Sequence, residues 1–254
     1  MDDHQLLIDL HKNAYRQGPG GDAETELALN LAMIDRTKSL KIADIGCGTG
    51  ASTLLLARLL NAKIIAVDFL PAFLDVLECR AIELGLSKKI KTLTCSMDEL
   101  PFDDEEFDVI WSEGAIYNIG FEAGVTNWNR CLKAGGVLVV SEITWTTDSR
   151  PAELQEYWES EYPEINIASA KIAILEKNGY KPIGFFVIPE HCWLENYYRP
   201  MQNRFDSFLT QYGNNKDARA IVENETREIE LYKKYRNYYS YGVYIARKLE
   251  IQMP

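Results

Sequence analysis

The sequence predicts an α/β fold in which a mostly parallel, seven-stranded sheet has helices on both faces. Short apolar runs alternate with segments of helical periodicity, and the first such run stops at closely spaced glycines. Repeated alternation of strand and helix favours a parallel sheet, because each helix returns the chain to the same edge. The expected strands cover residues 42–45, 63–67, 90–94, 107–111, 137–141, 180–188 and 241–249, with the last antiparallel to the sixth.

The first strand ends at Gly46, Gly48 and Gly50, and a helical pattern begins directly after them. Glycine accepts the positive φ of a tight turn. Because it has no Cβ atom, a ligand can approach the backbone and the free N–H groups of the following helix. Asp68 ends the second strand, where a carboxylate can accept both hydroxyls of a ribose. These features predict a site for an adenosine-like ligand.

The glycine spacing and a nearby carboxylate indicate which ligand is expected. The order Gly-x-Gly-x-Gly differs from the Gly-x-Gly-x-x-Gly of dinucleotide sites, and Asp44 would repel a pyrophosphate but suit an ammonium and a sulfonium. With the motifs at 96–102, 107–111 and 132–140, residues 41–142 resemble class I S-adenosylmethionine-dependent methyltransferases, in the manner of the small-molecule enzymes of ubiquinone and menaquinone biosynthesis. The resemblance implies their Rossmann-like fold and S-adenosyl-L-methionine as cofactor, with Asp44, Gly46 and Gly48 in its site.

The N-terminal segment, residues 1–22, is expected to hold a helix over residues 5–15 and then a loop rich in glycine. Several methyltransferases of the type that the chain resembles fold such a segment over the cofactor. By this resemblance, Tyr15 and Gln17 are expected to close over the methionine end of the cofactor. A plain linker is the alternative.

The ends of the second and third strands are expected around the adenine. Phe69 follows the ribose carboxylate and can lie against the base, with ordinary packing as the alternative. In the family that the chain resembles, a carboxylate or amide after the third strand holds the adenine amino group, and the preceding side chain covers the ring. This implies roles for Ser96, Met97 and Asp98, although Ser96 or Asp98 can instead cap a turn.

The loop after the fourth strand is expected to face the sulfonium, because ligands of open α/β sheets bind outside the carboxyl ends of the strands. Glu113 and Tyr117 lie in this loop and are expected between cofactor and acceptor; a helix-start carboxylate and a packed aromatic ring are the alternative. A general base is optional. Its candidates are Glu113, Tyr117 and His191.

Helical patterns connect the strands. The first, over residues 24–35, is expected to place Leu27, Leu31 and Ile34 against the sheet. The second expected helix begins at Pro71, because proline suits the first turn of a helix. The other expected helices cover residues 71–84, 124–133 and 168–177, and a Gly135-Gly136 turn precedes the fifth strand.

Two segments interrupt this alternation, residues 144–167 and residues 190–238. The second is expected to contain amphipathic helices over residues 201–212 and 216–238. Both segments are interpreted as covering the substrate. In the second, Trp193, Tyr197 and His191 would line a lid, and the alternative is a dimer contact or burial of the sheet edge.

Composition limits the partners. The net charge is −11, and the longest basic clusters are only lysine pairs, so no nucleic-acid groove is expected. Five scattered cysteines and three histidines lack metal-site spacing, and the consecutive carboxylates of residues 103–106 are expected to form a solvated turn, so no metal is expected. Without an apolar run of bilayer length or a signal segment, no membrane is expected, and the cytoplasm is the expected location.

The sequence thus predicts one domain, residues 1–254, that transfers a methyl group from S-adenosylmethionine to a small-molecule acceptor by in-line displacement. The cofactor brings an activated group, so the protein has to align donor and acceptor and to exclude water. Two other functions are compatible with the fold: an NAD-dependent dehydrogenase, which the glycine spacing and Asp44 disfavour, and a non-catalytic protein that binds S-adenosylmethionine.

Overall fold

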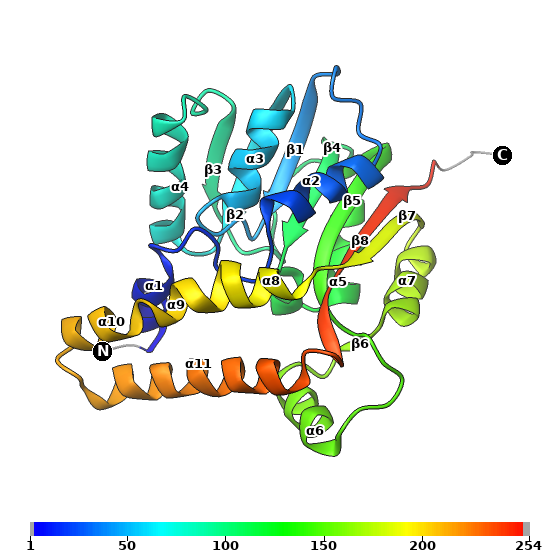
Figure 1. Cartoon of the computed structure of the whole chain (residues 1–254). Helices are drawn as coiled ribbons and strands as arrows, with labels where there is room; N and C mark the ends of the chain where they lie inside the picture. The colour runs from blue at the N-terminus through cyan, green and yellow to red at the C-terminus, as the bar shows by residue number, and fades with distance from the viewer. Residues whose placement is uncertain (1–2, 251–254) are drawn as a thin grey trace.

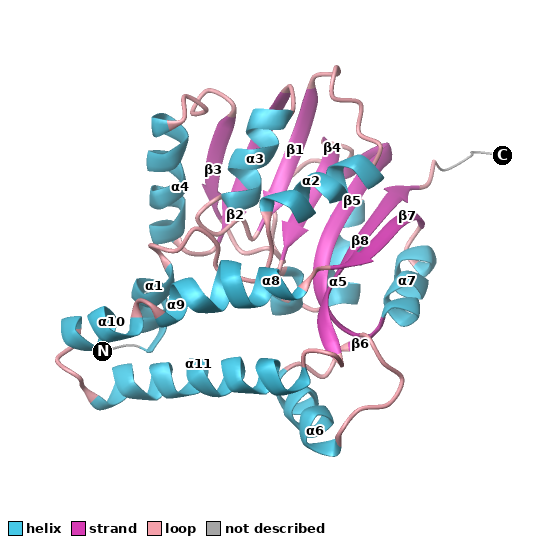
Figure 2. Ribbon diagram, in the orientation of Figure 1, coloured by secondary structure: helices cyan, strands magenta, loops and turns pink. Residues whose placement is uncertain are grey.

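The computed structural model describes residues 3–250 and forms one mixed sheet with helices on both faces (Figure 1 and Figure 2). The strands are β1 (Leu40–Ile45), β2 (Ala62–Asp68), β3 (Ile90–Thr94), β4 (Phe107–Glu113), β5 (Leu132–Trp145), β6 (Asn166–Ile167), β7 (Tyr180–Val187) and β8 (Tyr239–Lys248). Their order is β3-β2-β1-β4-β5-β8-β7, with β6 beside the end of β5. β8 is antiparallel to both of its neighbours and the other pairs are parallel. The expected fold is confirmed, with the two-residue β6 as an addition.

Two large hydrophobic cores lie on opposite faces of the sheet. Successive residues of β1 alternate between them, because side chains of a strand point to opposite faces: Ile42 joins one core, and Ala43 joins the other. The helices that cover the sheet are α2 (Asp22–Leu31) and α3 (Ala51–Leu59) over the first core, α5 (Phe121–Asn129) and α7 (Ala168–Lys177) over the second, and α4 (Pro71–Glu83) beside β2 and β3. A smaller hydrophobic cluster lies between α3, α4 and β2.

A further layer of helices covers the carboxyl ends of the strands (Figure 1). It consists of α1 (Asp3–His11) and the insertion before β8, which comprises α8 (Glu190–Trp193), the π-helical turn η2 (Leu194–Tyr198), α9 (Arg199–Gln202), α10 (Phe205–Gln211) and α11 (Lys216–Tyr235). α1 packs on α10 and α11, so the N-terminal segment and the insertion before β8 together form one cover. The other insertion contributes α6 (Ala152–Glu161).

Three details of the expected elements were wrong. Leu27 is exposed, because α2 begins at Asp22 and turns Thr25, Ala28 and Leu29 toward the core instead. The glycines at 135 and 136 lie inside β5, where the pairing with β4 shifts register, and do not form a turn before it. The expected helix over residues 201–212 is divided between α9 and α10.

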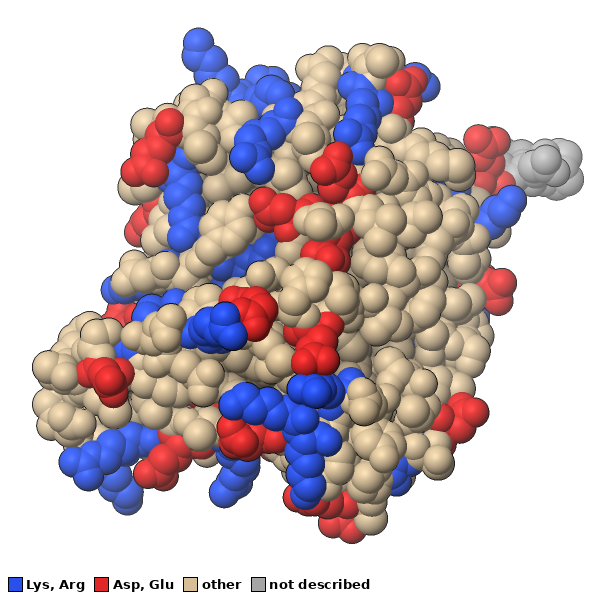
Figure 3. All heavy atoms as spheres, viewed as in Figure 1, with Lys and Arg blue, Asp and Glu red and all other residues tan. Residues whose placement is uncertain are grey.

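Across residues 3–250 no helix has the length and apolar character needed to cross a bilayer. On the face shown in Figure 3, basic and acidic side chains are interspersed and form no continuous basic stripe.

Candidate functional site

A cavity of about 710 Å³ opens outside the carboxyl ends of β1 to β4. The strand order reverses at β1, which has β2 on one side and β4 on the other, and ligands of open α/β sheets bind at this point. The walls come from the glycine turn after β1, the ends of β2 and β3, the loop after β4, the N-terminal segment and α11. The cavity therefore joins the expected cofactor site to the helical cover.

The glycine turn fits tightly at one end of the cavity. Gly46 has a φ of 72°, and a Cβ atom there would lie 2.3 Å from the Cβ of Ala115. Gly48 has a φ of 56°, and a Cβ atom there would lie 2.4 Å from Oε1 of Gln17. Both positions need glycine because an L side chain would meet backbone strain and a steric clash. The turn delivers its backbone and the start of α3 to the cavity wall.

Asp68 and Phe69 stand where the sequence places them, on the cavity wall at the end of β2. Asp68 accepts the N–H of Gly48 at 2.8 Å and the N–H of Leu70 at 2.9 Å. Burial raises the pKa of Asp68, and these N–H donors oppose the rise. A carboxylate has about four acceptor sites, so capacity remains for ligand hydroxyls. The ring of Phe69 is largely exposed at the cavity edge.

Ser96, Met97 and Asp98 also line the cavity, directly after β3. The loop after β3 is held in place by α5, because the indole N–H of Trp128 donates to the carbonyl of Met97 at 2.9 Å. The hydroxyl of Ser96 donates to the carboxylate of Asp98. The structure thus brings the expected adenine-binding residues to the same wall as Asp68. Their roles stay a prediction.

A partly buried ion pair that the sequence analysis missed joins the N-terminal segment to β4. Nη1 of Arg16 lies 2.9 Å from Oε2 of Glu113, and Nη2 lies 3.0 Å from Asp22. The other oxygen of Glu113 accepts the hydroxyl of Thr25 at 2.7 Å and the indole N–H of Trp111 at 2.9 Å. Because both of its oxygens are engaged, Glu113 is held in place on the cavity wall, and its role as a general base stays a prediction.

Of Tyr15 and Gln17, which were expected to close over the cofactor, only Gln17 lines the cavity. Its Oε1 accepts the N–H of Thr49 at 2.8 Å, and its Nε2 donates to the hydroxyl of Thr49 at 3.0 Å, so the segment rests on the glycine turn. Tyr15 lies outside the cavity lining; its ring is half-exposed, and its hydroxyl donates to Asp22 at 3.2 Å. Its expected contact with the cofactor is not supported.

Asp44 also departs from expectation. It is 1% exposed, and its Oδ2 accepts the hydroxyls of Ser52 at 2.9 Å and Thr53 at 2.6 Å. The alternation along β1 points residue 44 toward the same face as Ile42, under α3, and not into the cavity. Burial raises the pKa of Asp44 to about 7. Asp44 therefore anchors the start of α3, and Oδ1, buried without a described hydrogen-bond partner, is its open acceptor.

The far end of the cavity is lined by aromatic and acidic side chains. Tyr117 is there as expected, and Tyr197 comes from η2. Three more lining residues, His11, Glu225 and Glu228, were missed by the sequence analysis. The expected lid residue Trp193 is instead a core residue: its ring stacks on Tyr232 with centroids 4.5 Å apart, and its indole N–H donates to Ser240 at 2.9 Å.

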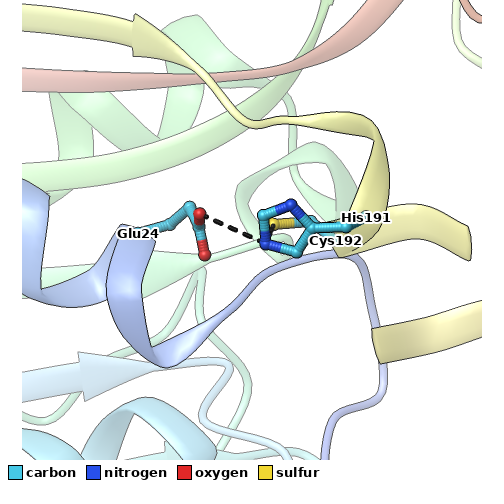
Figure 4. A group of neighbouring side chains, drawn as sticks. All are labelled: Glu24, His191 and Cys192. Carbon is cyan, nitrogen blue, oxygen red and sulfur yellow. Dashed lines mark hydrogen bonds and ion pairs between the residues drawn. The ribbon is translucent and has the colours of Figure 1, made fainter. Parts of the chain in front are cut away.

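His191 lies outside this cavity, in a cluster with Glu24 and Cys192 (Figure 4). Its Nε2 is 3.5 Å from Oε1 of Glu24, and potential ligand atoms of the three residues lie within 4.8 Å of one another. The sequence analysis did not anticipate this cluster, because Glu24 lies in α2, far along the chain from the other two residues in α8. Burial raises the pKa of Cys192, so its thiol stays protonated. The cluster joins α2 to α8, and a general-base role for His191 is not supported.

Comparisons with known proteins find methyltransferases that are similar to the same region. Residues 43–140 match the methyltransferase domain family. A demethylmenaquinone methyltransferase of Tropheryma whipplei is 32% identical over 115 residues, 44% of this chain and 45% of that protein. The chain spans about half the length of the curated methyltransferases that it matches.

Two solved structures share the fold over nearly the whole chain. One is a SAM-dependent methyltransferase from Geobacter sulfurreducens in complex with S-adenosyl-L-homocysteine (TM-score 0.84, 16% identity), aligned over 96% of this chain and 98% of the other. The second is the [4+2]-cyclase SpnF (TM-score 0.78, 20% identity), aligned over 97% and 93%. The expected resemblance is thereby confirmed.

Proposed function

We propose that this chain, whose residues 43–140 match the methyltransferase domain family, is an S-adenosylmethionine-dependent methyltransferase that transfers a methyl group to a small-molecule acceptor. The observation on which this rests most is the cavity that joins the glycine turn to the helical cover. One end has the features of an adenosine site, and the other is closed by aromatic and acidic side chains. A single continuous space for donor and acceptor is what a transfer reaction needs.

The residues of the first end fit S-adenosylmethionine. Gly46 and Gly48 leave the backbone open where a Cβ atom would clash with Ala115 or Gln17. Asp68 keeps acceptor capacity for ribose hydroxyls, and residues 96–98 with Phe69 hold and cover the adenine. When bound, the cofactor supplies an activated methyl group on a sulfonium.

The chain's own contribution is alignment and exclusion of water. The Arg16–Glu113 pair fixes the end of β4, so that Tyr117 faces the cavity from a constrained loop. Orientation of this kind can lower a barrier by about 7–11 kcal/mol. Tyr117 and Tyr197 present aromatic rings that favour positive charge, each by about 0.5–2 kcal/mol.

Two rival functions remain to be separated by experiment. A nicotinamide-dependent dehydrogenase is disfavoured by the family of residues 43–140. The second is a protein that binds the cofactor without transferring its methyl group; a fold is no guarantee of a reaction, since a [4+2]-cyclase shares this one.

The test uses the purified full-length chain in two steps. Titration calorimetry with S-adenosylmethionine, S-adenosylhomocysteine and NAD is expected to show binding of the first two only. Incubation with S-adenosylmethionine labelled in its methyl group and fractionated small-molecule extract is then expected to yield a labelled product together with S-adenosylhomocysteine. Binding of NAD alone would overturn the assignment, and cofactor binding without labelled product from any fraction would favour the non-catalytic function.

A further inference from the structure

The inward face of α11 is interrupted by two carboxylates. Positions three and four residues apart form one stripe along a helix. On α11, the first two and the last two residues of this stripe are buried and pack into the core that contains Ile42. The two middle positions hold glutamates that line the cavity. The stripe is Ala218, Ile221, Glu225, Glu228, Tyr232 and Tyr235. An apolar stripe with two acidic residues at its centre is unusual, because burial of an unpaired carboxylate is costly.

Among residues 3–250, these two carboxylates have one titratable basic partner, His11, and form no pair with a lysine or arginine. Glu228 accepts the hydroxyl of Tyr198 at 2.8 Å, and no lysine, arginine or histidine within residues 3–250 pairs with it. Oε1 of Glu225 lies 3.5 Å from Nε2 of His11, but its Oε2 is buried without a described hydrogen-bond partner. Burial, and then the charge of Glu225, raise the pKa of Glu228 to about 7.

The rest of the cavity does not supply the missing charge. Its acidic lining residues outnumber its basic ones, and Arg16 is already paired with Glu113 and Asp22. The acidic residues are Asp68, Asp98, Glu113, Glu225 and Glu228, and the basic ones are Arg16 and His11.

The walls around the two glutamates suit a cation with an apolar body. Tyr117 and Tyr197 line the same end of the cavity, together with Leu7 and Ile8 of α1. The charges of Glu228 and Glu225 act on the hydroxyl of Tyr197, whose pKa is raised first by burial and then by these two carboxylates. Aromatic faces beside carboxylates attract organic ammonium groups through cation–π and ionic interactions together.

We infer that the acceptor is a small amine with an apolar body, whose ammonium group lies between Glu225 and Glu228 at the Tyr117–Tyr197 end of the cavity. The inference deepens the proposed function and rests on it, because a bound amine is an acceptor only if the chain transfers a methyl group. The amine supplies the positive charge that the lining lacks, and its body covers the aromatic rings.

The experiment measures charge preference in the chain saturated with S-adenosylhomocysteine. A panel of primary amines, 2-phenylethylamine, tyramine and hexylamine, is titrated calorimetrically at pH 7.5 beside the matched alcohol and carboxylate of each. At least one amine is expected to bind at least tenfold more tightly than its alcohol, and the carboxylates are expected to bind more weakly still. Glu228→Gln and Glu225→Gln should each weaken binding of that amine by roughly tenfold and leave its alcohol unchanged.

Glu223→Gln is the matched control, because Glu223 is exposed on the same helix. It should leave every affinity unchanged. The inference is overturned if no amine of the panel binds more tightly than its alcohol, or if the preference survives in both glutamine variants. Titration of S-adenosylhomocysteine itself is a separate readout: its failure would remove the proposed function, whereas the charge preference can still be measured on the free chain.

Discussion

Nη1 of Arg16 and Oε2 of Glu113 lie 2.9 Å apart, although 97 residues separate them in the sequence. The pair closes the N-terminal loop over the end of β4, and Arg16 is only 7% exposed. Because Glu113 sits on the cavity wall, the same contact fixes both the cover and one side of the site.

Arg16→Met should destabilise the chain, because it leaves Glu113 without its cation and leaves Asp22 with only its 3.8 Å pair to Arg58. The expected loss in the free energy of unfolding is about 1–3 kcal/mol, less than for a fully buried pair, since Glu113 retains some exposure. Urea unfolding measures it. Arg36→Met, which removes an exposed pair with Glu26, is the control and should cost less than about 1 kcal/mol. Equal losses in both variants would contradict a special role for Arg16.

Gly46→Ala should cost more stability than Gly85→Ala, although both glycines have positive φ. A Cβ atom at Gly85 meets open space, so only the backbone penalty of about 1–2 kcal/mol applies. At Gly46 the contact with Ala115 adds about 1–3 kcal/mol. The comparison is made by urea unfolding of the free chain, and similar losses would show that the turn has room to relax.

Asp68→Ala should weaken binding of S-adenosylhomocysteine by roughly 10- to 100-fold, because charge-assisted hydrogen bonds to the ribose are lost and the N–H of Gly48 loses its acceptor. Titration calorimetry gives the dissociation constant. Asp75→Ala, at an exposed position of α4, serves as the control and should change nothing. Unchanged affinity of the Asp68 variant would contradict the proposal that Asp68 accepts the ribose hydroxyls.

Asp44→Asn should flatten the pH dependence of stability. The folded-state pKa of about 7 lies above the ordinary value of 3.8, so the native state holds a proton that the unfolded state has released between these pH values. The stability contribution of this group is therefore full below about pH 4 and is lost as pH rises to 7. The variant should gain up to about 4 kcal/mol relative to the parent between pH 4 and pH 8, measured by urea unfolding. A parallel pH profile in both proteins would refute the raised pKa.

Tyr117→Phe should lower kcat by less than about threefold. Burial raises the pKa of Tyr117, so its hydroxyl is protonated at neutral pH and cannot remove a proton from the acceptor. Loss of a true general base would cost roughly 10²–10⁴-fold. Turnover of the acceptor identified by methyl labelling provides the measurement, and a drop of a hundredfold or more would restore Tyr117 as the base.

Local sequence was sufficient wherever one short segment forms a feature by itself. The glycine turn, Asp68 at the end of β2 and residues 96–98 were all predictable, because strand, turn and helix follow each other within a few residues and the carboxyl ends of parallel strands converge. The antiparallel last strand was correct as well.

Only the tertiary structure decided which polar side chains face the cavity. Asp44 is buried under α3 and outside the cavity lining, whereas Arg16 reaches Glu113 although 97 residues separate them. Glu225 and Glu228 acquire their position from the packing of α11 across the ends of the strands. A sequence sets the periodicity of a helix, but which partner meets its inward face depends on contacts between distant segments, and those are settled only when the chain packs.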